Sequence, residues 1–261
     1  GSSMAIDAEK VQGGVQSLEI GLTVLDALMI KNTPLMLKEL AEILSMHPAK
    51  VHRYVVSLIR KGYAKQLDDG RYSLGDRAHY LALNTLKRND LLQSIQDLII
   101  EIQLHLNCSV HISKWLGDNA VVVQSLESSH PINIITRVGS RMPLLDSATG
   151  RLQACYQSEK IIRPLLEKEW REQPSSRRAL QSWDDFLKLK AKILKQGYAV
   201  VLGEMLMGIN AISITILDHN QELAYVVTCI GTHDHLPEQR LDEIIQYLLS
   251  MQAKIQNYIQ H

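Results

Sequence analysis

The residues of this sequence that most clearly indicate a binding function are a cluster of basic side chains between His47 and Tyr72. Only two acidic residues, Asp68 and Asp69, lie in the same stretch. The basic residues are Lys50, Arg53, Arg60, Lys61, Lys65 and Arg71. Clustered Lys and Arg side chains bind nucleic-acid phosphates because binding releases condensed counterions. The alternative interpretation is a solvated helix face. The predicted secondary structure around the cluster distinguishes a nucleic-acid site from such a face.

The stretch from Leu37 to Leu74 predicts a winged helix-turn-helix around this cluster. A first short helix is followed by a break, and Pro48 suits the first turn of a second helix because it has no N–H to leave unpaired. Gly62 is expected to end that helix. Two short β-type runs, 63–67 and 71–74, are joined by an Asp-Asp-Gly turn signal. This order of elements is typical of DNA-binding domains, and we expect a double-stranded DNA partner.

Positions within the motif predict the role of each side chain. The front of the second helix is expected to face base edges, while the helix end and the hairpin contact phosphates. The predicted DNA-binding residues are Ala49, Lys50, His52 and Arg53 at the front, and Arg60, Lys65 and Arg71 at the helix end and wing. One such motif covers few base pairs, so we expect a homodimer on a palindromic operator.

The composition is that of an ordinary globular protein with two domains. The chain has 261 residues, 46% of them hydrophobic, and its 28 basic and 28 acidic residues give no net charge. DNA binding must therefore come from a local patch. Three cysteines without a CxxC spacing indicate a reducing compartment, so we expect a cytoplasmic location. No apolar run approaches the roughly 20 residues of a membrane span.

Four segments are expected along the chain. Residues 1–14 comprise the remnant of an expression tag and a flexible arm. Residues 15–75 form the winged helix-turn-helix domain, and residues 76–90 form a linker helix. In residues 91–261, paired strands with helices around them predict an α+β effector-binding and oligomerisation domain with an antiparallel sheet.

Some elements carry more specific expectations. The first helix is predicted to be capped by Ser17 and to bury one face, made of Leu18, Leu22, Leu25 and Met29. A single amphipathic helix is expected over Leu91–Leu106, and a strand over Ile132–Val138. The candidate dimer interface is the first helix together with spare apolar positions of the linker helix, Tyr80, Leu83 and Leu86.

The sequence has no recognisable motif for catalysis. A Walker loop, GxGxxG, HExxH and GxSxG are all missing, so we expect no enzyme and no cofactor. His105, Cys108 and His111 are spaced like metal ligands, as are His233 and His235, but ordinary packing is favoured over a zinc site for both groups. Cys155 has no paired His nearby and is expected to be a buried structural thiol.

A run of small residues, Ser147-Ala148-Thr149-Gly150, marks a predicted helix start. Exposed backbone N–H groups at a helix start suit a carboxylate or a phosphate ligand. A simple N-cap by Ser147 explains the same residues. The sequence alone does not distinguish a ligand site from a simple N-cap.

Motifs spread along the whole chain, in a fixed order, are similar to those of one known family. They are VQSLEIGLTVLDAL in the first helix, KVHRYVVSLIRKGYA in the second helix of the motif, Gly139 to Pro143, Ser147 to Gly150, Gln196 to Tyr198, Glu204, Gly208 to Ile212 and Thr228 to Gly231. With them the chain resembles the isocitrate lyase regulator (IclR) family of bacterial transcription factors.

The resemblance implies a transcription regulator, often a repressor, whose operator binding is modulated by a small-molecule effector. The effector would be a carbon-catabolism metabolite such as a small organic or sugar acid, and dimers would pair into tetramers. The alternatives are a metal-responsive regulator on the same scaffold and an enzyme that carries a DNA-binding module. The resemblance implies an effector site formed by Ser147, Ala148, Thr149, Ile209, Ala211, Thr228 and Ile230.

Three departures from the family pattern change these expectations. Ile20 stands where the family usually has Arg, which removes one DNA contact. Ala49-Lys50 replaces the usual Ser-Thr, which should change the operator sequence. Leu145-Asp146 replaces the usual His-Ala, so we add Asp146 to the effector site as an acceptor for a hydroxyl of a neutral or hydroxyl-rich ligand.

Overall fold

The computed structural model describes residues 13–31, 33–87, 90–128 and 137–261. The chain divides into two compact units, residues 1–90 (unit 1) and 91–261 (unit 2), each of which is described by itself. Most of the strand expected over Ile132–Val138 lies outside the described residues. Among the helices that the structure describes, none is both long and apolar enough to span a bilayer.

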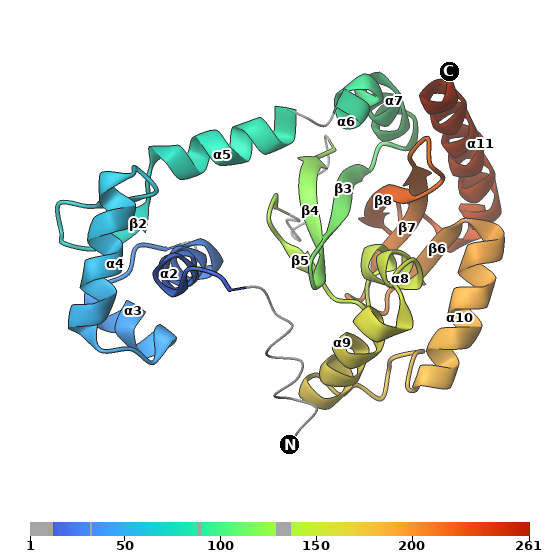
Figure 1. Ribbon diagram of the computed structural model, residues 1–261. Helices are drawn as coiled ribbons and strands as arrows, with labels where there is room; N and C mark the ends of the chain where they lie inside the picture. The colour runs from blue at the N-terminus through green and yellow to red at the C-terminus, as the bar shows by residue number, and fades with distance from the viewer. Residues whose placement is uncertain (1–12, 32, 88–89, 129–136) are drawn as a thin grey trace. The chain divides into compact units, whose positions relative to one another are not determined.

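Unit 1 is built from helices and a two-stranded hairpin (Figure 1). Its elements are α2 (Gln16–Lys31), α3 (Leu37–Leu44), α4 (Pro48–Arg60), β1 (Ala64–Gln66), β2 (Tyr72–Leu74) and α5 (Asp76–Lys87). Local chemistry sets the start of α4, where Pro48 occupies the first turn and the His47 Nδ1 accepts a hydrogen bond of 3.1 Å from the Ala49 N–H. The antiparallel pairing of β1 with β2 completes the predicted winged helix-turn-helix.

The core of unit 1 lies where α2, α3, α4 and the hairpin meet. Val51 and Val55 of α4 are fully buried there, as the helical spacing predicts. The expected buried face of α2 is wrong, because Leu18, Leu22 and Met29 are about half exposed or more. The residues that α2 buries instead are Val24, Ala27 and Leu28. The helix also begins at Gln16, so Ser17 lies inside it and is not the N-cap.

A six-stranded antiparallel sheet organises unit 2, in the spatial order β5-β4-β3-β8-β7-β6. The strands are β3 (Ser109–Leu116), β4 (Asn119–Leu126), β5 (Arg141–Met142), β6 (Tyr198–Leu202), β7 (Ile209–Leu217) and β8 (Leu223–Thr232). The expected α+β fold is thereby confirmed. Alternate residues of a strand face opposite sides of a sheet. In β8, Val227 and Cys229 therefore join one core while Val226 joins the other.

Helices cover both faces of this sheet. They are α6 (Asp90–Ser94), α7 (Gln96–Leu106), α8 (Ala148–Cys155), α9 (Glu159–Glu172), α10 (Trp183–Gln196) and α11 (Leu241–Gln260), with a 3-10 turn at Glu238–Arg240. The helices α7 and α11 contribute to one core, and α8, α9 and α10 contribute to the other. The expectation of a single helix over Leu91–Leu106 is wrong, because the helix is interrupted at Ile95, between α6 and α7. Ile95 is fully buried at this break.

The start of α8 packs unusually close to the loop that precedes it. A Cβ added to Gly150 would lie 2.0 Å from the Pro143 carbonyl oxygen and 2.7 Å from the Leu144 Cα. Both are backbone atoms, which cannot swing aside as a side chain can. Gly150 is therefore required for backbone packing, and this explains one of the small residues in the run from Ser147 to Gly150.

We expect Gly150→Ala to destabilise unit 2 by about 1–3 kcal/mol, because the added methyl group forces α8 away from residues 143–144. Trp115, Trp170 and Trp183 all lie in unit 2, so tryptophan fluorescence during urea unfolding reports on this unit. Gly21→Ala in α2 is the matched control, because its Cβ would make only an ordinary 3.7 Å contact with the Tyr54 ring. Since α2 lies in unit 1, which has no Trp, unfolding of this variant is followed by circular dichroism. Equal urea midpoints for the Gly150→Ala and wild-type proteins would show that the close packing is unimportant.

Candidate functional site

The front of α4 presents its polar side chains to solvent. Val51 and Val55 hold the opposite face of the helix in the core. The predicted DNA-binding residues are all exposed: Ala49, Lys50, His52, Arg53, Arg60, Lys65 and Arg71. The structure therefore keeps the base-facing and phosphate-facing candidates free to reach a duplex.

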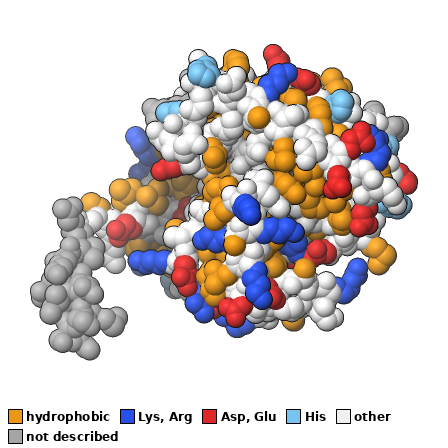
Figure 2. Space-filling view, turned by 90° about the vertical axis from the view of Figure 1, so that its right-hand side faces the viewer, with side chains coloured by type: hydrophobic (Ala, Val, Ile, Leu, Met, Phe, Trp, Pro, Cys, Tyr) orange, Lys and Arg blue, Asp and Glu red, His pale blue; other side chains and the backbone are white. Residues whose placement is uncertain are grey.

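Most of the predicted DNA-binding Lys and Arg side chains of this surface form no ion pair within the described residues. Within the described residues, Lys50, Arg53, Arg60 and Lys65 form no ion pair, whereas Arg71 lies 3.7 Å from the Asp69 carboxylate. An exposed pair of this kind contributes little to stability. Arg71 should therefore exchange its contact with Asp69 for a contact with a DNA phosphate at little cost in free energy. In contrast, Lys and Arg (blue) are interspersed with Asp and Glu (red) on the face that carries α10 and α11 (Figure 2).

The second site is a cavity of about 40 Å³ in unit 2, between the start of α8 and the strands β6, β7 and β8. Seven of the eight expected effector positions line it: Ser147, Ala148, Thr149, Ile209, Ala211, Thr228 and Ile230. The structure adds five residues that the sequence did not single out for this site: His111, Met142, Val201, Met205 and Leu206. Apart from His111, these additions are apolar, so the cavity has an apolar wall with few polar groups.

Asp146 is the eighth expected position, and it does not line the cavity. Its two carboxylate oxygens accept hydrogen bonds from Arg178, at 2.7 Å to Nε and 3.0 Å to Nη2. The Arg178 side chain is almost fully buried, so this pair is a structural clamp on the segment before α8. The expectation that Asp146 accepts a hydrogen bond from a ligand is therefore corrected.

Ser147 is the N-cap of α8, as one of the two interpretations of this run expected, and this role is compatible with a ligand site at the helix start. Its Oγ accepts a hydrogen bond of 2.8 Å from the Gly150 N–H, so it is the N-cap of α8. Within the described residues, the N–H groups of Ala148 and Thr149 have no hydrogen-bond partner. Both residues line the cavity, so the helix start is capped and its two unpaired N–H groups are candidate donors for a ligand.

A chain of buried hydrogen bonds joins α8 to the sheet beside this cavity. The Thr149 hydroxyl lies 2.6 Å from the His111 Nε2 and 2.5 Å from the Thr228 hydroxyl. The Thr228 hydroxyl lies in turn 2.6 Å from Ser213 Oγ. A second link runs from Gln153 Nε2 to Ser113 Oγ, at 3.1 Å. All these side chains are buried, and we call them the polar seam.

His111 is the residue of this site that burial perturbs most. It is fully buried, and burial lowers its pKa from 6.5 to about 4. The imidazole is therefore neutral at pH 7. Its Nδ1 has no hydrogen-bond partner among the described residues.

The loop from Gly203 to Gly208 forms one wall of the cavity. Both glycines have positive φ, 72° and 82°, a conformation that other residues rarely adopt. Met205 and Leu206 contribute the side chains of the wall. Between them and β6, Glu204 accepts a 2.6 Å hydrogen bond from Arg151 of α8. The loop is thus anchored to the helix that starts at the cavity.

The histidine and cysteine groups do not converge on a metal. His105 stacks on the Tyr247 ring, Cys108 is buried in the core, and His111 belongs to the polar seam. His233 is exposed. No cluster of three potential ligands occurs in the part of the chain that the structure describes.

All three cysteines are buried free thiols. Burial raises the pKa of Cys155 to about 12, so this thiol is not ionised near neutral pH. The expectation of a structural thiol in α8 agrees with this environment.

Comparison with known proteins identifies both halves of the chain. Residues 17–68 match the family described as the IclR helix-turn-helix domain, and residues 83–257 match the bacterial transcriptional regulator IclR C-terminal domain. The HTH-type transcriptional regulator KdgR of Escherichia coli is 23% identical over 83% of this chain and 82% of its own length. The transcriptional repressor IclR of the same organism is 20% identical over 93% of this chain and 89% of its own length.

Solved structures show the same fold. HmgR of Pseudomonas aeruginosa has a TM-score of 0.58 and 28% identity, covering 95% of this chain and 99% of its own. An IclR homolog of Microbacterium hydrocarbonoxydans, solved with 4-hydroxybenzoate, has a TM-score of 0.75 and 15% identity, covering 93% of this chain and 98% of its own.

The buried imidazole of His111 should make unit 2 less stable in mild acid. The unfolded chain takes up a proton near pH 6.5, whereas the folded His111 takes it up only near pH 4. The unfolded state therefore binds more protons in this window, and the free energy of unfolding falls as the pH drops through it, by about 3 kcal/mol in total. We expect the His111→Gln protein to lose less stability than the wild type over this range. Parallel profiles in tryptophan-monitored urea unfolding would contradict the assignment.

Proposed function

Since the chain belongs to the IclR family of bacterial transcription regulators, we propose that it binds an operator through α4 and the hairpin and that a small-molecule effector in the unit 2 cavity modulates this binding. The observation that carries the first part is the exposed, largely unpaired basic surface of α4 and its wing. The observation that carries the second part is the cavity at the α8 start. The free thiols suit the reducing cytoplasm in which we place the protein.

The effector that we propose is a small organic acid. The N–H groups of Ala148 and Thr149 at the start of α8 are donors suited to a carboxylate. The Microbacterium relative was solved with an aromatic acid, 4-hydroxybenzoate, which agrees with this class of ligand. A sugar acid has less support, because Asp146, the acceptor expected for its hydroxyls, is occupied by Arg178.

A ligand can act only as far as it prefers one conformation of the protein over another. The cavity of about 40 Å³ is far below the roughly 300–1,000 Å³ of typical small-molecule sites. An organic acid must therefore displace the loop from Gly203 to Gly208. We propose that this displacement is the conformational change that the effector selects.

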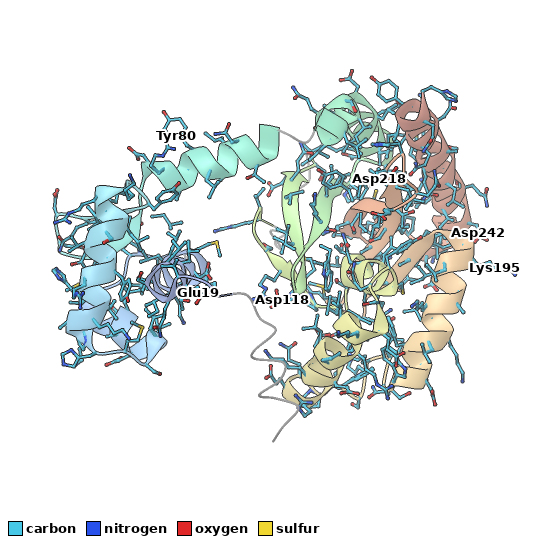
Figure 3. The ribbon with its side chains drawn as sticks, viewed as in Figure 1. Glu19, Tyr80, Asp118, Lys195, Asp218 and Asp242 are labelled. Carbon is cyan, nitrogen blue, oxygen red and sulfur yellow. The ribbon has the colours of Figure 1, made fainter. Side chains whose placement is uncertain are left out.

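We further propose that the protein acts as a homodimer, with tetramers formed by pairs of dimers. An apolar groove of about 550 Å³ lies between α2, α4 and α5, with Leu18, Leu22 and Leu81 in its wall. Tyr80 projects from α5 into solvent (Figure 3), and Leu83 is also exposed. The side chain of Leu86 lies outside the described residues. A second copy of unit 1 would remove this apolar surface from water.

The DNA contacts are tested by comparing two exposed basic residues. Arg53→Ala should weaken specific binding by about 1–3 kcal/mol if Arg53 makes a bidentate base contact. Lys65→Ala should lower the affinity for all sequences and flatten the dependence on salt, because it removes a phosphate contact. The DNA is a fragment selected from random sequences with the wild-type protein, and binding is measured by fluorescence anisotropy at several salt concentrations. Unchanged affinity of a folded Arg53→Ala protein would refute its role.

The oligomeric state is tested by light scattering at micromolar concentration. We expect a dimer or tetramer for the wild type, and a halved particle mass after Leu18→Glu with Leu22→Glu, because two charges then lie in the proposed interface. Ile161→Glu on α9 changes an exposed apolar residue of the other unit and is the control. A wild-type monomer, with and without DNA, would exclude the proposal.

A further inference from the structure

We propose that the Nδ1–H of His111 is the side-chain donor that recognises the effector, and that the effector is a compact organic acid with an apolar body. This inference rests on the proposed function, because it assumes that the cavity is the effector site. It goes beyond that function by naming the recognition group and by separating acids with an apolar body from polyhydroxylated acids.

The tautomer of His111 depends on the direction of the hydrogen bonds along the polar seam. Three hydroxyl groups, on Thr149, Thr228 and Ser213, lie in one row that ends at the His111 Nε2. The four groups hold four protons for three hydrogen bonds, so one proton stays unpaired in either direction, on Ser213 Oγ or on the His111 Nδ1. The direction that we assign runs from Ser213 through Thr228 and Thr149 to the His111 Nε2, because the unpaired proton then lies on His111, which lines the cavity, and not on Ser213, which does not. Nε2 is then an acceptor, and the proton of the neutral ring is on Nδ1.

This assignment leaves a buried donor in need of an acceptor. His111 lines the cavity and is fully buried, and its Nδ1 has no partner among the described residues. An unpaired buried N–H is costly to a folded protein, so such a group in a ligand cavity indicates a recognition role. A carboxylate oxygen is the strongest acceptor that a small metabolite can offer.

The rest of the cavity favours an apolar ligand body. The hydroxyl protons of Thr149 and Thr228 are already used inside the polar seam. The two carboxylates nearest to the site along the chain do not line the cavity, because Arg178 binds Asp146 and Arg151 binds Glu204. Most of the remaining lining is apolar, including Met205, Leu206 and Ile230, so a ligand with several hydroxyl groups would lose most of their hydrogen bonds to water.

Matched acids test the ligand class on the full-length protein. Propionate and glycerate share a three-carbon skeleton and differ in hydroxyl groups, and benzoate and gluconate contrast a ring with a polyol of the same charge. Isothermal titration calorimetry should show binding of propionate or benzoate, and at least about tenfold weaker binding of its hydroxylated counterpart. Equal or tighter binding of the hydroxylated acids, or no binding of either apolar acid, would overturn the proposed ligand class.

Two substitutions test the donor. In His111→Gln the amide oxygen can still accept from Thr149, but no N–H remains at the Nδ1 position, so affinity for the apolar acid should fall about tenfold. His111→Asn places an amide N–H near that position and should restore most of the affinity. An unchanged affinity in a folded His111→Gln protein would overturn the role of His111.

A third variant separates this inference from the proposed function. Ala148→Val adds two methyl groups to the wall of this small cavity, so it should abolish or strongly weaken binding of every acid while the protein stays folded. If Ala148→Val binds as the wild type does, the cavity is not the effector site and both proposals for it fail. If Ala148→Val abolishes binding but His111→Gln does not weaken it, only the inference about His111 fails.

The tautomer can also be measured without a substitution that affects folding. In wild-type protein with ¹⁵N-labelled histidine, the ring that does not titrate between pH 7 and 5 should carry its proton on Nδ1. Its Nδ1 signal should shift when benzoate or propionate is added. A proton on Nε2 would refute the inference, even if the His111 variants do not fold.

Discussion

The rest of unit 2 depends on the polar seam between α8 and the sheet. Polar side chains inside an aliphatic core select one arrangement, because any shift of the helix leaves a buried group unpaired. Thr149 and Gln153 of α8 meet His111, Ser113 and Thr228 in this way. The opposite face of the sheet carries mainly aliphatic residues, which fix position less strictly. The seam therefore determines where the start of α8 lies, and with it the position of the cavity and of its backbone donors.

Elements whose ends are set by local chemistry could be predicted from the sequence. The helix α10 is an example: it runs from Trp183 to Gln196, the Ser182 side chain caps its start, and Gly197 ends it. The winged helix-turn-helix was predictable because Pro48, Gly62 and the Asp-Asp-Gly turn mark its boundaries in one continuous stretch. The residues around the cavity were predictable in part, since a family resemblance supplied positions that are far apart in the chain.

What the sequence did not reveal depends on partners distant in the chain. Asp146 looks like a free carboxylate until Arg178, 32 residues later, is seen to bind it. Ordinary packing was expected for His111 rather than a metal site, but its partner Thr149, 38 residues away, could not be identified from the sequence. One signal was available: His111 alternates with Val110 and Ile112, which puts it on the other face of the sheet from their core. The face that α2 buries was not predictable, because both of its faces are apolar.

If the effector acts by displacing the anchored loop beside the cavity, as proposed, the loop also sets how sensitive the regulator can be. A ligand that needs the loop displaced binds only the fraction of molecules in which it is displaced, and its apparent dissociation constant rises by the inverse of that fraction. With about one molecule in a hundred open, the response threshold would lie about a hundredfold above the intrinsic dissociation constant. Under that proposal, the ion pair between Arg151 and Glu204, which ties the loop to α8, would help to determine the fraction. The concentration at which the regulator responds could therefore evolve through this pair while the ligand contacts stay the same.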